Sequence, residues 1–123
     1  MTGRAIEIEG YRVWVVEEGT GEPIVYLHGF ADVPGLLTNT PPLQTELAKH
    51  YRVITPAHPA CSKSDEREDL DTMEDLVFHY LEIFDTLSLK SFHLIGACIG
   101  GWVAAEIAIR YPEKIKSLSL IGA

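Results

Sequence analysis

The sequence has few cysteines, few basic residues and no long hydrophobic run among its 123 residues. Its two cysteines, Cys61 and Cys98, are too few and too far apart for a disulfide framework or a zinc site. Lysine and arginine together number 10 against 18 acidic residues, which gives a formal net charge of -8. Phosphate binding requires clustered cationic side chains, so this charge argues against nucleic acid and anionic membrane partners. No apolar run approaches the roughly 20 residues of a membrane-spanning helix.

The N-terminal segment also lacks the apolar stretch of a secretory signal peptide, because acidic residues interrupt it at Glu7 and Glu9. Together with the scarcity of cysteine, this favours a reducing, cytoplasmic location. The composition, 46% hydrophobic and 23% charged, is typical of a globular protein. A chain of this length suits a single domain, which we expect to span residues 1–123.

What the sequence does contain is a regular alternation of strand-like and helix-like segments. Segments 4–8 and 11–16 alternate in polarity around Glu9-Gly10 and predict a β-hairpin. Further strands are predicted at 24–27, 51–55, 91–95 and 115–121. Helices are predicted at 40–48 (capped by Thr40), 71–87 and 102–110, and loops at 31–40 and 56–70. Phe84 and Trp102 are expected to be core aromatic residues. This order predicts an α/β fold, namely a mainly parallel sheet with right-handed crossovers, flanking helices on both faces and an N-terminal β-hairpin.

The junction between the predicted strand 91–95 and the helix after it carries a distinctive motif, Gly96-Ala97-Cys98-Ile99-Gly100-Gly101. A strand that turns into a helix within so few residues forces the central residue into strained backbone geometry. Such a turn requires neighbours without bulk, and Gly96 and Gly100 meet that requirement on either side of Cys98. We therefore expect the Cys98 side chain to project from the end of the sheet, at a helix N-terminus whose partial positive charge favours an anionic sulfur.

Other interpretations of these residues are weaker. A dinucleotide-binding phosphate loop would require glycine at the position of Cys98, and the flanking glycines argue against a buried hydrophobic role for this cysteine. Cys61 is either an incidental loop thiol or a partner of Cys98 in a disulfide or in thiol exchange. His58 is the only local histidine to consider as a substitute base, and an ordered loop residue is the simpler interpretation. The histidines of the predicted helices and strands have no partner at metal-ligand spacing, so no metal or organic cofactor is expected.

Four segments together form an ordered set of motifs. They are His28-Gly29-Phe30, Ala57-His58-Pro59 with Ser64-Asp65, the Cys98 motif, and Arg110-Tyr111-Pro112-Glu113 with Leu120-Ile121-Gly122-Ala123. In this order they resemble the N-terminal half of the α/β-hydrolase family. The similarity covers nearly the whole chain, which makes it far more specific than a lone G-x-C-x-G motif.

The resemblance implies a function for several positions. Cys98 takes the place of the nucleophile, and the backbone N–H groups of Phe30 and Ile99 would form the oxyanion hole. The supporting positions of the motifs are His28, which mainly fixes loop structure, Gly29, Gly96 and Gly100. The implied activity is hydrolysis of an ester or a related acyl or C–C bond of a small-molecule acyl substrate, through acyl transfer to sulfur.

Two departures from the family affect this interpretation. The usual nucleophile is serine, although the dienelactone-hydrolase group has the G-x-C-x-G-G pattern, so Cys98 is either native or a replacement for serine. The family also places its catalytic acid and histidine after later strands than this sequence contains. The alternative hypothesis is therefore a catalytically silent fold unit, either truncated or self-associating.

The resemblance also leaves the last predicted strand, 115–121, at an open edge of the sheet. Leu118, Leu120 and Ile121 on such an edge favour pairing with another chain. We therefore expect a homo-oligomer, a complementing fragment, or a chain that is one piece of a longer protein.

Overall fold

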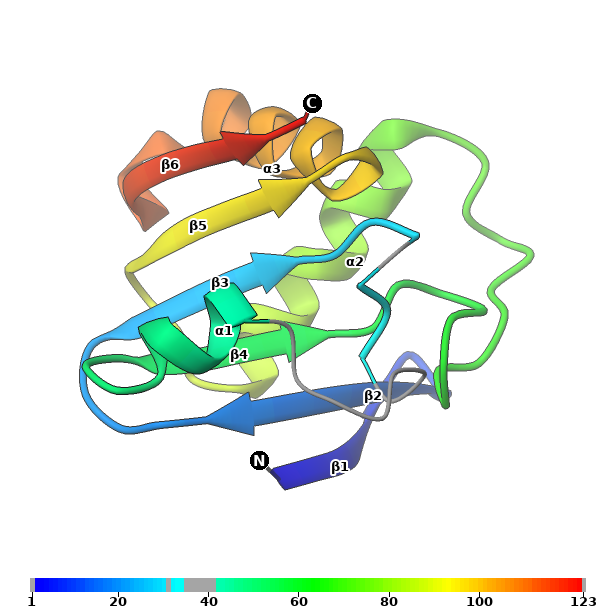
Figure 1. Cartoon of the computed structure of the whole chain (residues 1–123). Helices are drawn as coiled ribbons and strands as arrows, with labels where there is room; N and C mark the ends of the chain where they lie inside the picture. The colour runs from blue at the N-terminus through cyan, green and yellow to red at the C-terminus, as the bar shows by residue number, and fades with distance from the viewer. Residues whose placement is uncertain (1, 31, 35–41, 123) are drawn as a thin grey trace.

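The computed structural model describes residues 2–30, 32–34 and 42–122 (Figure 1). In chain order the elements are β1 (Thr2–Ile8), β2 (Tyr11–Glu18), β3 (Pro23–Leu27), α1 (Pro42–Leu47), β4 (Arg52–Pro56), α2 (Met73–Thr86), β5 (Phe92–Ala97), α3 (Ile99–Arg110), the 3-10 helix η1 (Pro112–Lys114) and β6 (Ile115–Ile121). The predicted cap Thr40 and most of the predicted loop 31–40 lie outside the described residues. Of the helices described, none combines the length and the apolar character needed to span a lipid bilayer.

The strands form one six-stranded mixed sheet in the order β1-β2-β4-β3-β5-β6. β1 pairs antiparallel with β2, which confirms the predicted hairpin, and β2 pairs antiparallel with β4. The pairings β4-β3, β3-β5 and β5-β6 are parallel, so the predicted α/β fold is confirmed. The carboxyl ends of β3, β4 and β5 lie at the same end of the sheet (Figure 1). Ligands bind at this end in folds of this kind.

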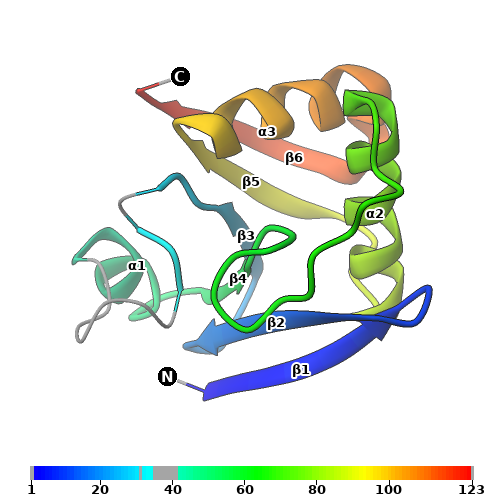
Figure 2. The same cartoon turned by 90° about the vertical axis from the view of Figure 1, so that its right-hand side faces the viewer.

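Helices cover both faces of the sheet, with α1 on one face and α2 and α3 on the other (Figure 2). Alternate residues of a central strand face these two layers. In β3, Val25 belongs to the core that contains α2 and α3, whereas Ile24 belongs to the smaller cluster beside Leu47 of α1. Both faces of the strand are therefore apolar, which explains its continuous hydrophobic run. The largest fully buried side chains of the core on the α2 and α3 side are Tyr80, Phe84 and Phe92.

The start of α2 is fixed by a capping box at the predicted position. The Asp75 N–H donates to the Thr72 hydroxyl at 3.1 Å, and the Thr72 N–H donates to the Asp75 carboxylate at 3.2 Å. These bonds satisfy N–H groups that the first helical turn and its cap would otherwise leave unpaired. The cap also fixes where Tyr80 lies, about two turns further along the helix.

The junction between β5 and α3 depends on two close backbone approaches. A Cβ atom on Gly96 would lie 2.5 Å from the Gly100 carbonyl oxygen, and one on Gly100 would lie 2.1 Å from the Leu27 carbonyl oxygen. Glycine is required at both positions, because any side chain would collide with backbone there. As a result α3 begins at Ile99 rather than at the predicted Trp102, and its first turn packs directly on the end of β3.

The prediction that Trp102 is a core residue is wrong, whereas Phe84 is fully buried as predicted. Trp102 is 56% exposed, because α3 turns Val103, Ala104 and Ile107 toward the sheet instead. Since α3 is apolar on most sides, its sequence pattern did not indicate which face packs.

His79 is a buried ionisable group in α2, with 2% of its surface exposed. Its Nδ1 atom accepts a hydrogen bond from the Arg67 guanidinium at 3.1 Å, and its Nε2 atom has no partner among the described residues. Burial, helped by the positive charge of Arg67, lowers the pKa of His79 to about 4. The ring is therefore neutral in the folded protein at neutral pH.

We predict that Gly100→Ala lowers the free energy of unfolding of the natural protein, in its full length, by about 3 kcal/mol, because the methyl group must displace the β3 backbone. Equilibrium chemical denaturation measures this loss. Gly10→Ala is a matched control, since Gly10 has a φ of 85° but a Cβ there would meet nothing within 4 Å. The control variant should lose only ~1 kcal/mol, the cost of left-handed backbone for alanine. Equal losses in the two variants would contradict the close-approach explanation.

We also predict that acidification destabilises the protein through His79. Between its ordinary pKa of 6.5 and its folded pKa of about 4, the unfolded chain binds a proton that the folded chain does not. The free energy of unfolding should therefore fall as pH falls, by up to about 1.4 kcal/mol per pH unit from this group. His79→Gln, which does not titrate, should reduce that slope when urea unfolding is measured from pH 6.5 down to pH 5. An unchanged slope in this variant would show that His79 is not the group responsible.

Candidate active site

Cys98 lies between β5 and α3 as the N-cap of the helix, and its side chain is exposed. Its backbone has φ 53° and ψ -119°, a strained combination for a residue other than glycine that persists only where the surrounding structure enforces it. The Cys98 N–H donates to the Ile121 carbonyl oxygen at 3.0 Å, and the Gly101 N–H donates to the Cys98 carbonyl oxygen at 2.9 Å. These bonds hold the strained turn, so the thiol is presented at the end of the sheet.

The segment His28-Gly29-Phe30 leaves β3 directly beside Cys98. A Cβ atom on Gly29 would lie 2.9 Å from the Cβ atom of Cys98, so glycine allows the two segments to touch. The N–H group of Phe30 has no hydrogen-bond partner among the described residues. Ile99 is the first residue of α3, where N–H groups have no partner inside the helix. The Cys98 thiol thus lies next to the Ile99 amide and to the loop that bears the Phe30 amide, and neither amide has a partner among the described residues.

His28 is completely buried and has both ring nitrogens engaged. Its Nδ1–H donates to the Gly29 carbonyl oxygen at 2.6 Å, and its Nε2 accepts from the His58 N–H at 2.9 Å. A carbonyl oxygen accepts only, which fixes the tautomer. Burial also lowers the pKa of His28, so the ring stays neutral. These contacts fit the loop-fixing role implied by the sequence, and they do not fit a catalytic base.

Both ring nitrogens of His58 are also engaged in structural hydrogen bonds, so His58 does not fit the role of a substitute base. Its Nε2–H donates to the His28 carbonyl oxygen at 2.7 Å, and its Nδ1 accepts from the Tyr80 hydroxyl. Burial, with a further contribution from His28, lowers the pKa of His58 to about 4. Both nitrogens are therefore occupied in a neutral ring.

Asp32 is a site residue that the sequence analysis missed. Its Oδ1 accepts a hydrogen bond from the Gly29 N–H at 2.6 Å, and its Oδ2 accepts one from the Tyr26 hydroxyl at 2.6 Å. Burial and the Asp32 carboxylate raise the pKa of Tyr26, so this hydroxyl remains a donor. Aspartate in a loop often bonds to nearby backbone, and that signal could have identified Asp32, three residues after Gly29.

The loop after β4 is tied to β2 by the predicted motif residues Ser64 and Asp65. The Ser64 hydroxyl accepts from the Trp14 N–H at 2.9 Å and donates to the Ala57 carbonyl oxygen at 3.0 Å. The Asp65 carboxylate accepts from the Arg12 N–H at 2.7 Å, which lowers the pKa of Asp65. These bonds hold the loop that carries His58 against the sheet.

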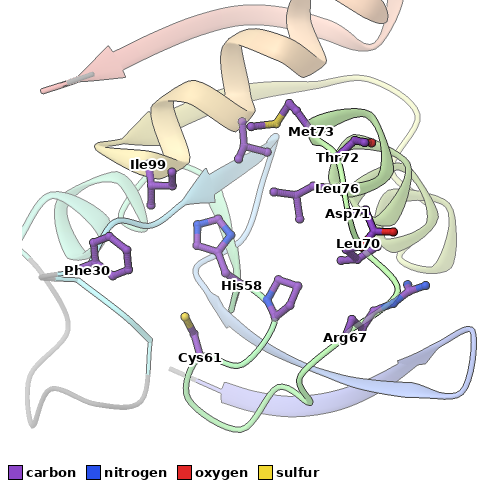
Figure 3. Close-up of a pocket in the computed structure, with 12 residues that line it drawn as sticks. Phe30, His58, Cys61, Arg67, Leu70, Asp71, Thr72, Met73, Leu76 and Ile99 are labelled. Atoms are coloured by element: carbon purple, nitrogen blue, oxygen red, sulfur yellow. The ribbon is translucent and has the colours of Figure 1, made fainter.

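A cavity of about 400 Å³ opens beyond the carboxyl ends of the parallel strands (Figure 3). The side chains of Phe30 and Ile99 lie on one side of it, those of Leu70 and Leu76 lie on the other, and His58 lies between them. Cys98 is not among its lining residues, although its neighbour Ile99 is. The cavity is mostly apolar and adjoins the two candidate donor amides.

Cys61 also lines this cavity, and it is a free thiol, as is Cys98. The structure therefore contains no disulfide between them, and burial raises the pKa of Cys61, which opposes formation of its thiolate. An incidental loop thiol is the interpretation that fits these observations. Within the described ranges, no group of three or more His, Cys, Asp or Glu side chains is arranged to hold a metal ion.

Comparison with known proteins places this geometry in context. The family described as alpha/beta hydrolase fold matches residues 22–123. The chain is 32% identical over 121 residues to 2-hydroxymuconate semialdehyde hydrolase from Pseudomonas sp. (strain CF600), with 98% of this chain and 43% of that protein covered. It is 30% identical over 122 residues to 2-hydroxy-6-oxo-2,4-heptadienoate hydrolase from Pseudomonas putida, with coverage of 98% and 44%.

Among solved structures, N-acyl homoserine lactonase complexed with N-butanoyl homoserine superposes with a TM-score of 0.84 at 28% identity, covering 99% of this chain and 45% of the lactonase. The chain thus spans less than half the length of the relatives that it matches. The region matched to the family includes Cys98, both candidate donor amides and the His28 loop. On this evidence the chain belongs to the α/β-hydrolase fold family.

Proposed function

We propose that the protein is a hydrolase in which Cys98 attacks the carbonyl carbon of an ester or a related acyl or activated C–C bond. The observation that carries this proposal is the strained, exposed Cys98 at the start of α3, in contact with the loop that bears the Phe30 amide. Strained backbone of this kind is concentrated at functional sites, because a fold otherwise avoids its cost. The N–H groups of Phe30 and Ile99 complete the proposed site as the oxyanion hole.

The proposed reaction proceeds through a thioester. The Cys98 sulfur forms a bond to the carbonyl carbon, and the electron pair displaced onto oxygen accepts hydrogen bonds from the Phe30 and Ile99 amides. Each such donor can be worth about 3 kcal/mol in the transition state. Breakdown of this intermediate expels the leaving group, which takes up the proton released by sulfur. Water then cleaves the thioester and restores the thiol.

This reaction needs a proton acceptor, and the two described histidines of the site do not supply it. His28 and His58 each have both ring nitrogens in hydrogen bonds. We therefore assign the acceptor to a part of the natural protein outside the described residues, or to a partner chain. The relatives support this assignment, since they are more than twice as long as the region matched.

The substrate class that we propose is a small molecule with a carbonyl group and an apolar portion. The names of the relatives, a semialdehyde hydrolase, a 6-oxo-dienoate hydrolase and a lactonase, refer to substrates that contain a carbonyl carbon. The mostly apolar cavity beside Phe30 and Ile99 suits the remainder of such a molecule. The free thiols Cys61 and Cys98 and the net charge of -8 fit a reducing, cytoplasmic setting without nucleic acid partners.

A catalytically silent fold unit is the second candidate. The observation that favours it is the engagement of both His28 and His58 in structural hydrogen bonds, which leaves neither of these histidines free to act as a base for Cys98. In that case the strained turn is inherited architecture. The two candidates differ in a direct way, because the silent unit predicts no hydrolysis that depends on Cys98.

We predict that Cys98→Ala lowers the hydrolysis of p-nitrophenyl acetate by the natural protein about 1,000-fold or more, because the attacking atom is lost. Cys61→Ala is the matched control, since it removes a thiol that lines the same cavity but has no proposed catalytic role, and its rate should stay near that of the unaltered protein. Intact mass measurement should show one acetyl group retained on the unaltered protein and none on Cys98→Ala.

Equal rates in the unaltered protein and in Cys98→Ala would support the silent unit. A Cys98→Ser variant with higher activity would indicate that sulfur stands in place of a native hydroxyl.

We also propose that the outer edge of β6 is covered in the natural protein, by a second copy or by the polypeptide that follows it. In the described residues β6 pairs with β5 on one side, and its residues Leu118, Leu120 and Ile121 are exposed. An edge strand with unpaired backbone groups and apolar side chains is a template for further pairing. The greater length of the relatives supports a covering segment.

We predict that residues 1–123 produced alone self-associate, and that a Leu118→Lys/Leu120→Lys double variant weakens this association because charges oppose edge pairing. Sedimentation velocity over a range of concentrations measures the effect. Ile109→Lys is the control, because Ile109 is an exposed apolar residue on α3 rather than on the edge strand. A stable, folded monomer of the unaltered chain would contradict the proposal.

A further inference from the structure

A buried hydrogen-bonded chain connects α2 to the loop that bears the Phe30 amide. The Tyr80 hydroxyl donates to His58 Nδ1, and His58 Nε2–H donates to the His28 carbonyl oxygen at 2.7 Å. The His58 backbone N–H donates in turn to His28 Nε2 at 2.9 Å, and the two imidazole rings lie 4.0 Å apart. Tyr80 and His28 are completely buried. The proposed catalytic steps use none of these side chains directly.

The chain has one consistent arrangement of protons. A carbonyl oxygen accepts only, so the proton of His58 lies on Nε2, and its Nδ1 requires a donor, which Tyr80 provides. By the same reasoning the proton of His28 lies on Nδ1, toward the Gly29 carbonyl oxygen. Burial lowers the pKa of both histidines, so both stay neutral and this arrangement holds at neutral pH.

These bonds fix the two peptide planes on either side of Gly29. In the first plane, the His28 carbonyl oxygen accepts from His58, and the Gly29 N–H donates to Asp32 at 2.6 Å. In the second plane, the Gly29 carbonyl oxygen accepts from His28 Nδ1 at 2.6 Å. A planar trans peptide directs its N–H opposite to its C=O, so fixing the Gly29 carbonyl also fixes the direction of the Phe30 N–H.

From this arrangement we infer that His58 and Tyr80 are positioning residues, which aim the Phe30 N–H at the reacting carbonyl through His28 and the Gly29 carbonyl. The inference rests on the proposed function, because it assigns a use to the Phe30 amide. Tyr80 of α2 is completely buried and does not line the cavity, whereas His58, in the loop after β4, also lines it. Both act on the Phe30 amide, which follows β3, through hydrogen bonds. Displacement of a donor amide weakens transition-state stabilisation more than substrate binding. Substitution of a positioning residue should therefore lower kcat and change KM little.

The experiment compares variants of the natural full-length protein in p-nitrophenyl ester hydrolysis. Tyr80→Phe removes the hydroxyl that orients His58 and keeps the ring that fills the core. We expect kcat to fall about 100-fold with KM changed little, as for a misplaced catalytic group. Alkylation of Cys98 by iodoacetamide, which forms no oxyanion, should keep its rate. Tyr51→Phe is the matched control, since it removes the hydroxyl of a partly buried tyrosine beside α1, and it should leave kcat unchanged.

A second pair of variants tests the same inference at His58. Glutamine offers an amide donor and a carbonyl acceptor, so His58→Gln should retain most of kcat, whereas His58→Leu, which offers neither, should lose about as much as Tyr80→Phe. This comparison also decides the matter if Tyr80→Phe does not fold. Unfolding midpoints of all variants confirm that each is folded at the assay temperature.

The outcomes separate this inference from the proposed function. If Cys98→Ala abolishes turnover while Tyr80→Phe or His58→Leu keeps its kcat, the positioning role is overturned and the proposed function stands. Equal losses in His58→Gln and His58→Leu, or a parallel loss of Cys98 alkylation, would also overturn it by pointing to general damage. If Cys98→Ala retains full turnover, the proposed function fails first and the positioning role fails with it.

Discussion

The first turn of α3 packs against bare backbone, and the rest of the site depends on that contact. Gly100 lies against the Leu27 and His28 carbonyl groups, and Gly96 lies against the backbone of Gly100 and Gly101. Side chains at either position would separate the helix from the sheet. Because the helix starts so close to β3, the single residue between strand and helix must take the strained backbone of Cys98. The same contact leaves the Ile99 amide at the helix N-terminus beside the Gly29 loop.

Around this contact, polar side chains orient the loop after β3 through hydrogen bonds. Asp32 holds the Gly29 amide, and the Tyr80–His58 pair holds the carbonyl of the same peptide plane. All of these groups are hydrogen-bonded, which limits the cost of burying them. The apolar sheet therefore supplies the stability of the fold, and the hydrogen bonds supply the direction of individual amides.

In chemical terms, the described part of the chain contains an exposed thiol on strained backbone, two amide donors without a partner there, and an apolar cavity beside them. In the proposed reaction these groups would stabilise negative charge on a carbonyl oxygen. Both ring nitrogens of His28 and of His58 are engaged in structural hydrogen bonds, so proton transfer in the proposed reaction is assigned to other residues. A proton acceptor outside the described residues is consistent with relatives that are more than twice as long as the region matched.

The order of the strands and helices, the hairpin and the turn at Cys98 could be predicted from the sequence, because they depend on local periodicity and on backbone conformations that few residues allow. The sequence did not reveal the hydrogen bonds of His58 and Tyr80, which lie 22 residues apart in the chain and meet only in the folded protein. It also misplaced Trp102, because an apolar helix does not show which of its faces will pack. A hydrogen bond between side chains that are distant in the sequence depends on the distance and direction that the folded sheet imposes, and no local pattern encodes either.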